Sequence, residues 1–466
     1  MRFFFITSCR LGFLGFILIL DAKEHGIQHG DEEQSDKCAD EACRQMALQH
    51  NHARQSAAFN TQQALHTQKS VWAQFFPDLS LQAGVLYDTG SGSLGVDGGM
   101  LPVGTMGQTG FVPSGSFAYF PSMDMKYDIN TIFSGSVFLK QPLYMGGKIR
   151  ASYQMSKMAV ELYRQGERKT EAEVLQTVDD AYAKMVKAKE LVLVAQKYKA
   201  LLQELDRNVE SAVRHGLRMQ NDRLKVGVRL DEVELQLRKA ENGLRLARMN
   251  LCHVTGQPLD TQLEVSSEYP QLDVLGQVQT TDVSLRPESA MLEYQTRIAS
   301  EQVRVARSSM LPSLALMAKY GYTNGIEMNG RKLLDGWNFG GGVTLSVPLY
   351  HFGANTQKVK AAKVKLQLAQ EEQADKREMM LLELQQAANN LDEAQLEVQL
   401  AEKSMAQAEE NMQISQKQYN AGMETLSDCL EAQAAWQKAS ESLVDAQFRR
   451  YLATVDYRRS AGLLAQ

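Results

Sequence analysis

Two carboxylate side chains, Asp428 and Glu431, stand three residues apart shortly after Gly422. Residues at this spacing lie on one face of a helix, so both acids would point the same way. Paired carboxylates attract cations, repel each other and raise each other's pKa values. The alternative interpretation is that they are solvated charges at a helix start, where acidic residues are favoured.

A block of glycine and proline landmarks positions this acid pair, because the block occurs twice. Each landmark recurs 206 positions later, as from Gly147 to Gly353. Constant spacing over such a distance indicates one structural unit built twice. The first copy contains Pro142-Leu143-Tyr144, Gly147, Gly216 and Gly256, and the second contains Pro348-Leu349-Tyr350, Gly353, Gly422 and Gly462.

The stretches 148–215 and 354–421 contain no proline and are rich in helix-forming residues. Each predicts a continuous helix roughly 100 Å long. Shorter helices are expected at 217–255 and 423–461, and at 39–75 and 287–311 where the chain enters each copy. End-to-end stacking of these shorter helices would match the long ones, which gives four parallel columns.

Each entering helix runs into a proline followed by alternating apolar residues, which predicts β-hairpins at 78–142 and 313–348. The first is longer, because Pro77 and Pro142 are 65 positions apart whereas Pro312 and Pro348 are 36 apart. The extra residues, roughly 88–130, are rich in Gly, Ser, Pro and Met and are interpreted as a long exposed loop.

Four strands with one apolar face cannot stand alone in a membrane, where an open sheet leaves backbone groups unpaired. Closed bacterial barrels need at least about eight strands. Two, three or more chains must therefore share one barrel, and the helical columns become staves of a shared tube.

The run from Tyr419 to Ala432, Tyr-Asn-Ala-Gly-Met-Glu-Thr-Leu-Ser-Asp-Cys-Leu-Glu-Ala, resembles the periplasmic helix turn of the TolC-like outer-membrane efflux protein family. The two Pro-Leu-Tyr boxes and the proline-bounded strands extend the resemblance over most of the chain. It implies a homotrimer with a twelve-stranded β-barrel in outer-membrane lipid and an α-helical barrel in the periplasm. The implied function is a passive exit duct for efflux or type I secretion, with a periplasmic adaptor and an inner-membrane pump as partners.

The same resemblance assigns site residues at the helix turns. Asp428 and Glu431 match the acidic ring at the periplasmic constriction. Tyr419 and Asp222 match a link between neighbouring hairpins, whereas Glu424 stands where some members carry arginine. A reversed pair from Arg218, or from its neighbours Arg214 and Arg223, to Glu424 or Asp428 is a further hypothesis.

The first residues, 1–22, have the charged start and apolar middle of a secretory signal. Neither Cys9 nor Cys38 stands where a lipid anchor would need it, so no lipid anchor is expected. The remainder divides into a first repeat at 23–265, a linker at 266–283 and a second repeat at 284–466.

Other chemistry has little support in the sequence. No nucleophile-and-base constellation predicts an enzyme, no histidine grouping predicts a metal or cofactor, and a net charge of −5 does not predict nucleic-acid binding. Cys252 and Cys429 are expected to be buried apolar residues, and a Cys38–Cys43 bridge stays open. The rival function is a structural or adhesive coiled-coil envelope protein. The transported substrate is not specified by these patterns.

Overall fold

The structure is a computed structural model that describes residues 37–38, 40–87, 90–108, 110–266, 269–270 and 282–464. The expected signal segment 1–22 and most of the expected linker 266–283 lie outside these residues. No described helix combines the length and the apolar character needed to cross a bilayer.

Two helices of 67 residues dominate the chain, α3 (Lys148–Arg214) and α6 (Ala354–Asn420). The glycines that precede them, Gly147 and Gly353, have φ values of 81° and 80°, a left-handed conformation that side chains with a Cβ disfavour. Each long helix turns back at a second left-handed glycine into a shorter helix. These partners are α4 (Gln220–Thr255) and α7 (Leu426–Ser460).

The helix expected at 39–75 is divided into α1 (Asp40–His50) and α2 (His52–Ala73), which corrects the prediction of one continuous run. Asn51 causes the break, because its extended backbone lets its side chain accept a hydrogen bond from the Ala53 N–H at 2.8 Å. The second repeat has one entering helix, α5 (Pro287–Ser308), with proline at its first position.

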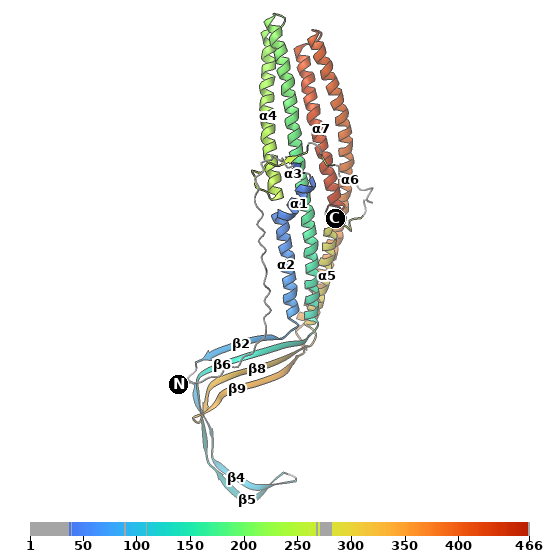
Figure 1. The fold of residues 1–466 in the computed structure, drawn as a ribbon. Coiled ribbons are helices and arrows are strands. Elements are labelled where there is room, and N and C mark those ends of the chain that lie inside the picture. The colour runs from blue at the N-terminus through green and yellow to red at the C-terminus, as the bar shows by residue number, and fades with distance from the viewer. Residues whose placement is uncertain are drawn as a thin grey trace, which may run out of the picture. The chain divides into compact units, whose positions relative to one another are not determined.

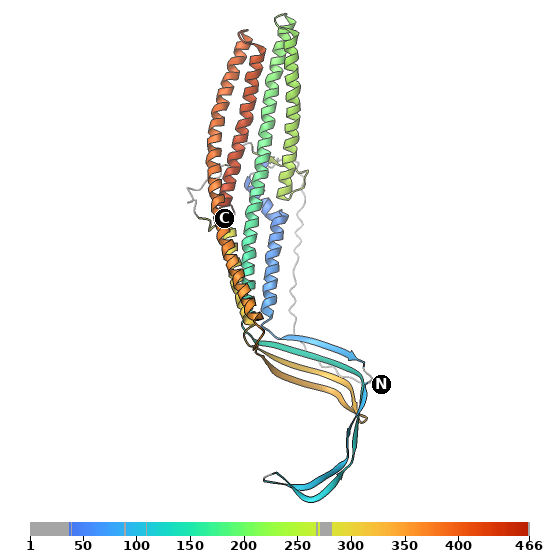
Figure 2. The same cartoon turned by 180° about the vertical axis from the view of Figure 1, so that it is seen from behind.

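Short helices stack end to end in both repeats, with α2 in line with α4 and α5 in line with α7 (Figures 1 and 2). At the first joint, the Asn51 amide donates to the Val254 carbonyl at 3.1 Å, which satisfies a free carbonyl at the end of α4. At the second joint, the chain at Gly462 lies against the backbone of Arg286, where α5 begins.

Gly462 offers a direct test of the second joint. A Cβ there would lie 2.8 Å from the Arg286 nitrogen, and the φ of +77° adds strain, whereas a Cβ at Gly353 meets no atom within 4 Å at a similar φ. Gly353→Ala should therefore cost only the left-handed strain, about 1–2 kcal/mol. Gly462→Ala should cost at least about 1 kcal/mol more in the free energy of unfolding, measured by denaturant titration of the helical circular dichroism. Equal losses for the two variants would show that the joint tolerates a Cβ.

An arginine that is buried or nearly so binds each entering segment to a long helix. Arg44 of α1 binds Asp179 of α3 through two hydrogen bonds of 2.7 and 2.8 Å, and the Asp179 side chain is 0% exposed. Burial raises the pKa of Asp179, and the hydrogen bonds from Arg44 oppose that shift. Burial also raises the pKa of the nearby Asp40 to about 6. The positive charge of Arg44 therefore offsets the cost of burying the carboxylates of Asp179 and Asp40.

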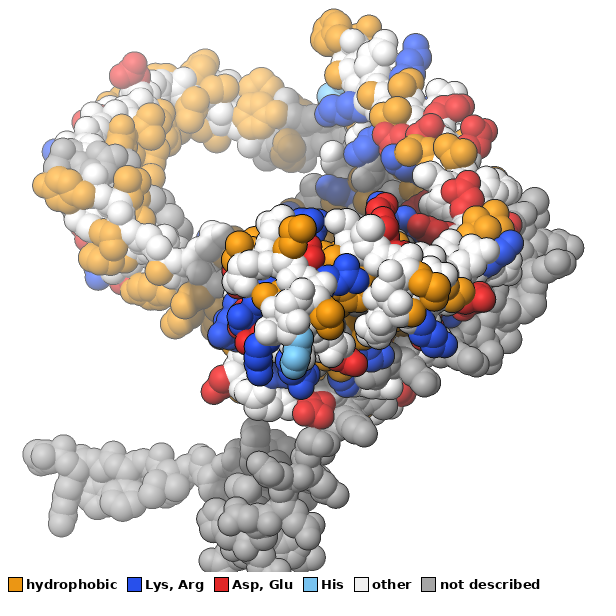
Figure 3. Space-filling view, turned by 90° about the horizontal axis from the view of Figure 1, so that it is seen from above, with side chains coloured by type: hydrophobic (Ala, Val, Ile, Leu, Met, Phe, Trp, Pro, Cys, Tyr) orange, Lys and Arg blue, Asp and Glu red, His pale blue; other side chains and the backbone are white. Residues whose placement is uncertain are grey.

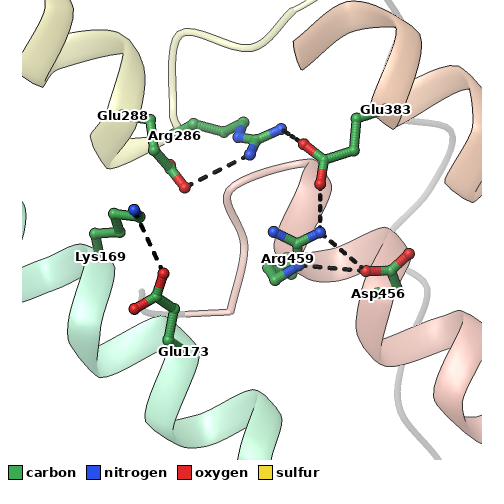
Figure 4. Close-up of polar contacts among 7 residues, drawn as sticks. All are labelled: Lys169, Glu173, Arg286, Glu288, Glu383, Asp456 and Arg459. Carbon is green, nitrogen blue, oxygen red and sulfur yellow. Dashed lines mark hydrogen bonds and ion pairs between the residues drawn. The ribbon is translucent and has the colours of Figure 1, made fainter. Parts of the chain in front are cut away.

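The second repeat uses a related network, drawn in Figure 4. Arg286, 4% exposed at the start of α5, binds Glu288 and also Glu383 of α6, the latter at 2.7 Å. Glu383 in turn accepts from Arg459 of α7, which also binds Asp456. One carboxylate of the long helix thus ties together the two helices that meet at the joint.

The main sheet is antiparallel and four strands wide, in the order β2 (Asp78–Leu86), β6 (Met123–Met145), β8 (Ser313–Met328), β9 (Arg331–Ser346). A further strand, β3 (Ser91–Val96), continues on the β2 side of β6. Elsewhere β1 (Lys37–Cys38) pairs in parallel with β7 (Glu264–Val265). The edges at β2 and β9 have no partner strand among the described residues.

The register places apolar residues opposite one another on one face of this sheet. Leu81 pairs with Val137, Val137 with Tyr320, and Tyr320 with Phe339. Adjacent strands therefore carry one continuous apolar stripe, and alternate residues, such as Ser80 and Ser136, belong to the other face. The hairpins do have the single apolar face that their alternation predicts.

The tip at 88–130 was expected to be a loop, and this prediction is wrong. It contains β3, β4 (Gly99–Gly107), β5 (Gly110–Phe120) and the beginning of β6. Glycines dominate the composition, but the residues between them include Leu, Val, Met, Phe and Tyr, which support extended pairing.

The cysteines whose side chains the structure describes are in two chemical states. Cys252 and Cys429 are free and buried, as predicted. Cys43 is buried and disulfide-bonded. Whether Cys38 is its partner, the pairing that the sequence left open, lies outside the described side chains.

Candidate functional site

The site expected at the helix turns is built from two α-hairpins with the same backbone design. The Leu217 N–H bonds to the Ala212 carbonyl, and the Met423 N–H bonds to the Gln418 carbonyl, both at 2.9 Å. Gly216 and Gly422 supply the positive φ that this helix ending requires. The turns therefore differ only in their side chains.

A shared apolar cluster packs the two hairpins together behind the turns. It draws buried residues from all four helices, so each hairpin is positioned by the other. Trp436 and Tyr419 are its large aromatic members from the second hairpin. The buried residues are Tyr198, Leu202, Leu205, Val209, Val226, Val233, Met412, Tyr419, Leu426, Cys429 and Trp436.

Tyr419 links the two turns. Its side chain is 6% exposed, and the Arg218 guanidinium of the first turn lies 4.8 Å from the ring centroid. Burial raises the pKa of Tyr419, the Arg218 charge opposes this, and the Asp222 charge adds to it. A cation over an aromatic face is attractive, and more so where water is excluded. The structure thus assigns Tyr419 an arginine contact, with Asp222 acting through its charge.

Asp428 has a local structural role. The Thr425 hydroxyl donates to the Asp428 carboxylate at 2.6 Å and accepts from the Asp428 N–H at 3.3 Å, which caps the start of α7. This agrees with the alternative interpretation of Asp428 as a helix-start acid. It leaves the carboxylate exposed, so a second role in a pore is compatible with the cap.

Equivalent positions in the two copies of the repeat carry different charges at the helix turns. Asp222 and Lys225 of the first turn occupy the positions of Asp428 and Glu431 in the second. Asp222 and Lys225 form an ion pair at 4.0 Å. The second turn replaces this neutral pair with two acids. Glu431 and Lys225 both line an open groove of about 690 Å³ between α4 and α7.

The reversed pairs proposed for the arginines of the first turn are not formed in this chain. Arg214 and Arg223 both bind Glu210 in their own hairpin, at 3.6 and 3.1 Å. Within the described residues, Glu424 makes no ion pair with an arginine, and its Oε2 is buried without a hydrogen bond. A neighbouring chain could supply such a contact only across an interface.

Sequence reasoning missed the apolar residues at the turns. Leu217, Met219 and Met423 are 78%, 76% and 76% exposed, although charged side chains crowd the helical part nearest the viewer in Figure 3. Their signal was available, because an apolar residue follows the turn glycine in both copies. Clustered apolar side chains that are exposed at the helix turns are typical of a contact surface.

The family model described as outer membrane efflux protein matches residues 43–257 and 267–463, which is nearly the whole described chain. The chain belongs to the outer membrane efflux protein family. Its two matched segments correspond to the two copies of the repeat.

Members and structural relatives of the outer membrane efflux protein family agree with the fold. VceC from Vibrio cholerae superposes with a TM-score of 0.72 at 17% identity, covering 91% of this chain and 96% of VceC. CmeC from Campylobacter jejuni gives 0.71 at 17% identity, covering 96% and 94%. The outer membrane protein TolC of Vibrio cholerae serotype O1 is 24% identical over 250 residues, 52% of this chain and 55% of TolC. The match thus spans about half the length of that curated relative.

Proposed function

We propose that three copies of this chain form an exit duct through which substrates pass passively from the periplasm to the exterior. Four strands from each copy form a twelve-stranded barrel in the outer membrane, and the helices form a tube in the periplasm. The duct serves a tripartite efflux or type I secretion system with a periplasmic adaptor and an inner-membrane pump. Family membership supports the channel.

The continuous apolar stripe across β2, β6, β8 and β9 is the observation that carries this proposal. An apolar outer face suits lipid, but the free edges at β2 and β9 leave unpaired backbone groups that lipid does not tolerate. Pairing β9 of one copy with β2 of the next removes the free edges of the main sheet. A ring of three copies has the strand number of a closed barrel of moderate width.

The same ring would bring three copies of Asp428 and Glu431 together at the periplasmic end. Like charges held around an axis favour cations and resist the passage of anions. In this proposal the Arg218–Tyr419 contact holds neighbouring hairpins in the closed arrangement, with Asp222 and Glu424 as secondary contributors.

The exposed apolar residues at the turns support an adaptor at that end, because Leu217 and Met423 offer contact area that solvent does not favour. A photoreactive residue at Met423 should capture the adaptor in cells. One at Leu396, also exposed but on α6 far from the turn, should not. Equal capture at both positions would place the adaptor elsewhere.

Mass and conductance test the duct itself. The protein purified in detergent should have the mass of a trimer and should open ion-conducting channels when it is added to a planar bilayer. A monomer that produces no current would contradict the proposal and would favour a structural coiled-coil protein.

Removing the cation from the Tyr419 contact should loosen the gate. Arg218→Gln should raise the open probability about 2- to 5-fold per link, because an exposed to partly buried cation–π contact contributes ~0.5–1 kcal/mol. Single-channel recording measures this directly. Arg214→Gln is the matched control, since Arg214 binds Glu210 of its own hairpin. If both variants open the channel equally, a general loss of positive charge explains the effect and the link does not.

A further inference from the structure

The hairpin of β4 and β5 is an addition to the first repeat. In the second repeat, β8 turns directly into β9 at Asn329 and Gly330, both with positive φ, as a two-residue turn requires. This turn lies beside Lys126 of β6. The Asn329 N–H donates to the Lys126 carbonyl, and the Asn329 side-chain oxygen accepts from the Lys126 N–H. The chain of β4 and β5 lies beyond this turn and extends for about 30 Å if fully straight.

This hairpin carries no charge. From Gly98 to Met123 the sequence contains no Asp, Glu, Lys, Arg or His. In Figure 3 the strands, which lie farther from the viewer, show mostly hydrophobic and uncharged side chains. A contiguous exposed apolar segment without charge is typical of an interaction surface.

Both faces of the hairpin are apolar and exposed. Met100 pairs with Tyr119 and Pro102 with Phe117, and these side chains share one face. Met100, Tyr119 and Phe117 are 66%, 69% and 65% exposed. Leu101 belongs to the opposite face and is also exposed. A hairpin of two strands is marginal in water without further strands or a packed face.

Lipid is not a suitable environment for this hairpin, because hydrocarbon offers no hydrogen-bond partner to the backbone groups at its edges. Among the described residues, each of its two strands has one free edge, and unpaired backbone groups are excluded from hydrocarbon. Nor can the edges readily recruit further strands, because β4 contains Pro102 and β5 contains Pro113, and proline confines a strand to a sheet edge. The faces are therefore the surfaces that need a partner, and the edges remain in water.

We propose that the β4–β5 hairpins of the three protomers pack on one another through the Met100, Phe117 and Tyr119 face and form an uncharged collar at the external mouth of the duct. The inference rests on the proposed trimer. Three hairpins that start from one barrel rim have an effective concentration on the order of millimolar, which favours this contact over any free partner. Packing of identical uncharged faces covers the aromatic side chains of that face and leaves the edges hydrated.

Cross-linking in the intact protein tests the collar. Met100→Cys, treated with a short bis-maleimide, should give covalently linked protomers within a particle whose native mass is that of one trimer. Ser93→Cys on β3 is the matched control, because its three copies would be held apart on the barrel wall and should not link. Adding Phe117→Asp to Met100→Cys should reduce linking about tenfold through repulsion among the three faces, without changing the mass.

The outcomes separate this inference from the proposed function. A trimer that conducts but shows no link at Met100 overturns the collar and leaves the duct intact, whereas a monomeric mass overturns the duct itself. Links that join two trimers would show contact between particles and would contradict the collar. Quenching by brominated lipid that is markedly stronger for Met100→Trp than for the parent, in which Trp337 is already exposed on β9, would place the hairpin in the bilayer and would equally overturn the proposal.

Discussion

Replacing Arg44 with methionine is expected to lower the free energy of unfolding by about 3–5 kcal/mol. The change keeps most of the apolar stem but removes both hydrogen bonds to Asp179, whose side chain is 0% exposed. Asp40, 3.3 Å from the guanidinium, loses the same partner. Two carboxylates would then be buried without their ion-paired arginine, leaving only the more distant charge of Arg458, and denaturant titration of the helical signal would measure the loss.

Two further variants show whether charge burial is the cause. Arg44→Met combined with Asp179→Leu removes the Arg44–Asp179 pair and should recover part of the loss, because an apolar pair of similar size often replaces a buried ion pair without cost. The remainder of the loss belongs to Asp40, which still lacks its partner. Lys184→Met removes an exposed partner of Asp180, one residue along α3, and should change stability by less than about 1 kcal/mol. A double variant no more stable than the single one would point to lost packing.

The joint substitution Asp428→Asn and Glu431→Gln is expected to abolish cation preference in the channel. In a trimer it would remove both negative charges of every protomer from one constriction, and the low-salt cation conductance should fall by ~10-fold. The amide oxygen that replaces the Asp428 carboxylate would still accept a hydrogen bond from the Thr425 hydroxyl, so the cap of α7 should survive. Reversal potentials under a KCl gradient would measure the change in selectivity.

Two controls, a measurement at high salt and a substitution of another acidic residue, show whether Asp428 and Glu431 act on ions in the pore or are only solvated charges. At 1 M salt the Debye length is about 3 Å, so the double variant and the parent should conduct alike. Glu232→Gln is the control, because Glu232 lines the same groove as Glu431 but is paired with Arg229 at 2.7 Å. Unchanged selectivity in the double variant would leave Asp428 with its capping role alone.

Local patterns were enough to locate the helices and the sheet. Glycines at 206-residue spacing sit where the backbone needs a positive φ, so helix starts and ends could be predicted near Gly147, Gly216, Gly353 and Gly422. Alternation and flanking prolines gave the strand faces, because side chains in a strand alternate with period two. The glycine content of the tip predicts a loop, but the apolar residues between the glycines support strand pairing there.

The candidate site was predicted in part. The motif from Tyr419 to Ala432 located the turn, and its cap and chain reversal follow from residues close in sequence. The partner of Tyr419 could not be deduced, because Arg218 lies in the other hairpin and reaches the ring only through the packing of four helices. The resemblance implies Asp222 as the partner of Tyr419, and it offers Arg214, Arg218 and Arg223 only as partners of Glu424 or Asp428.

The sequence by itself determined the repeat, the long helices, the amphipathic strands and the family of this protein, since turns, caps and periodicity depend on residues within one or two turns of each other. Only the tertiary structure decided that Asn51 divides the entering helix at a joint, that Arg44 meets Asp179 across 135 positions, and that the tip forms strands. Such contacts depend on which distant surfaces are packed together, and a local pattern carries no information about its distant partner.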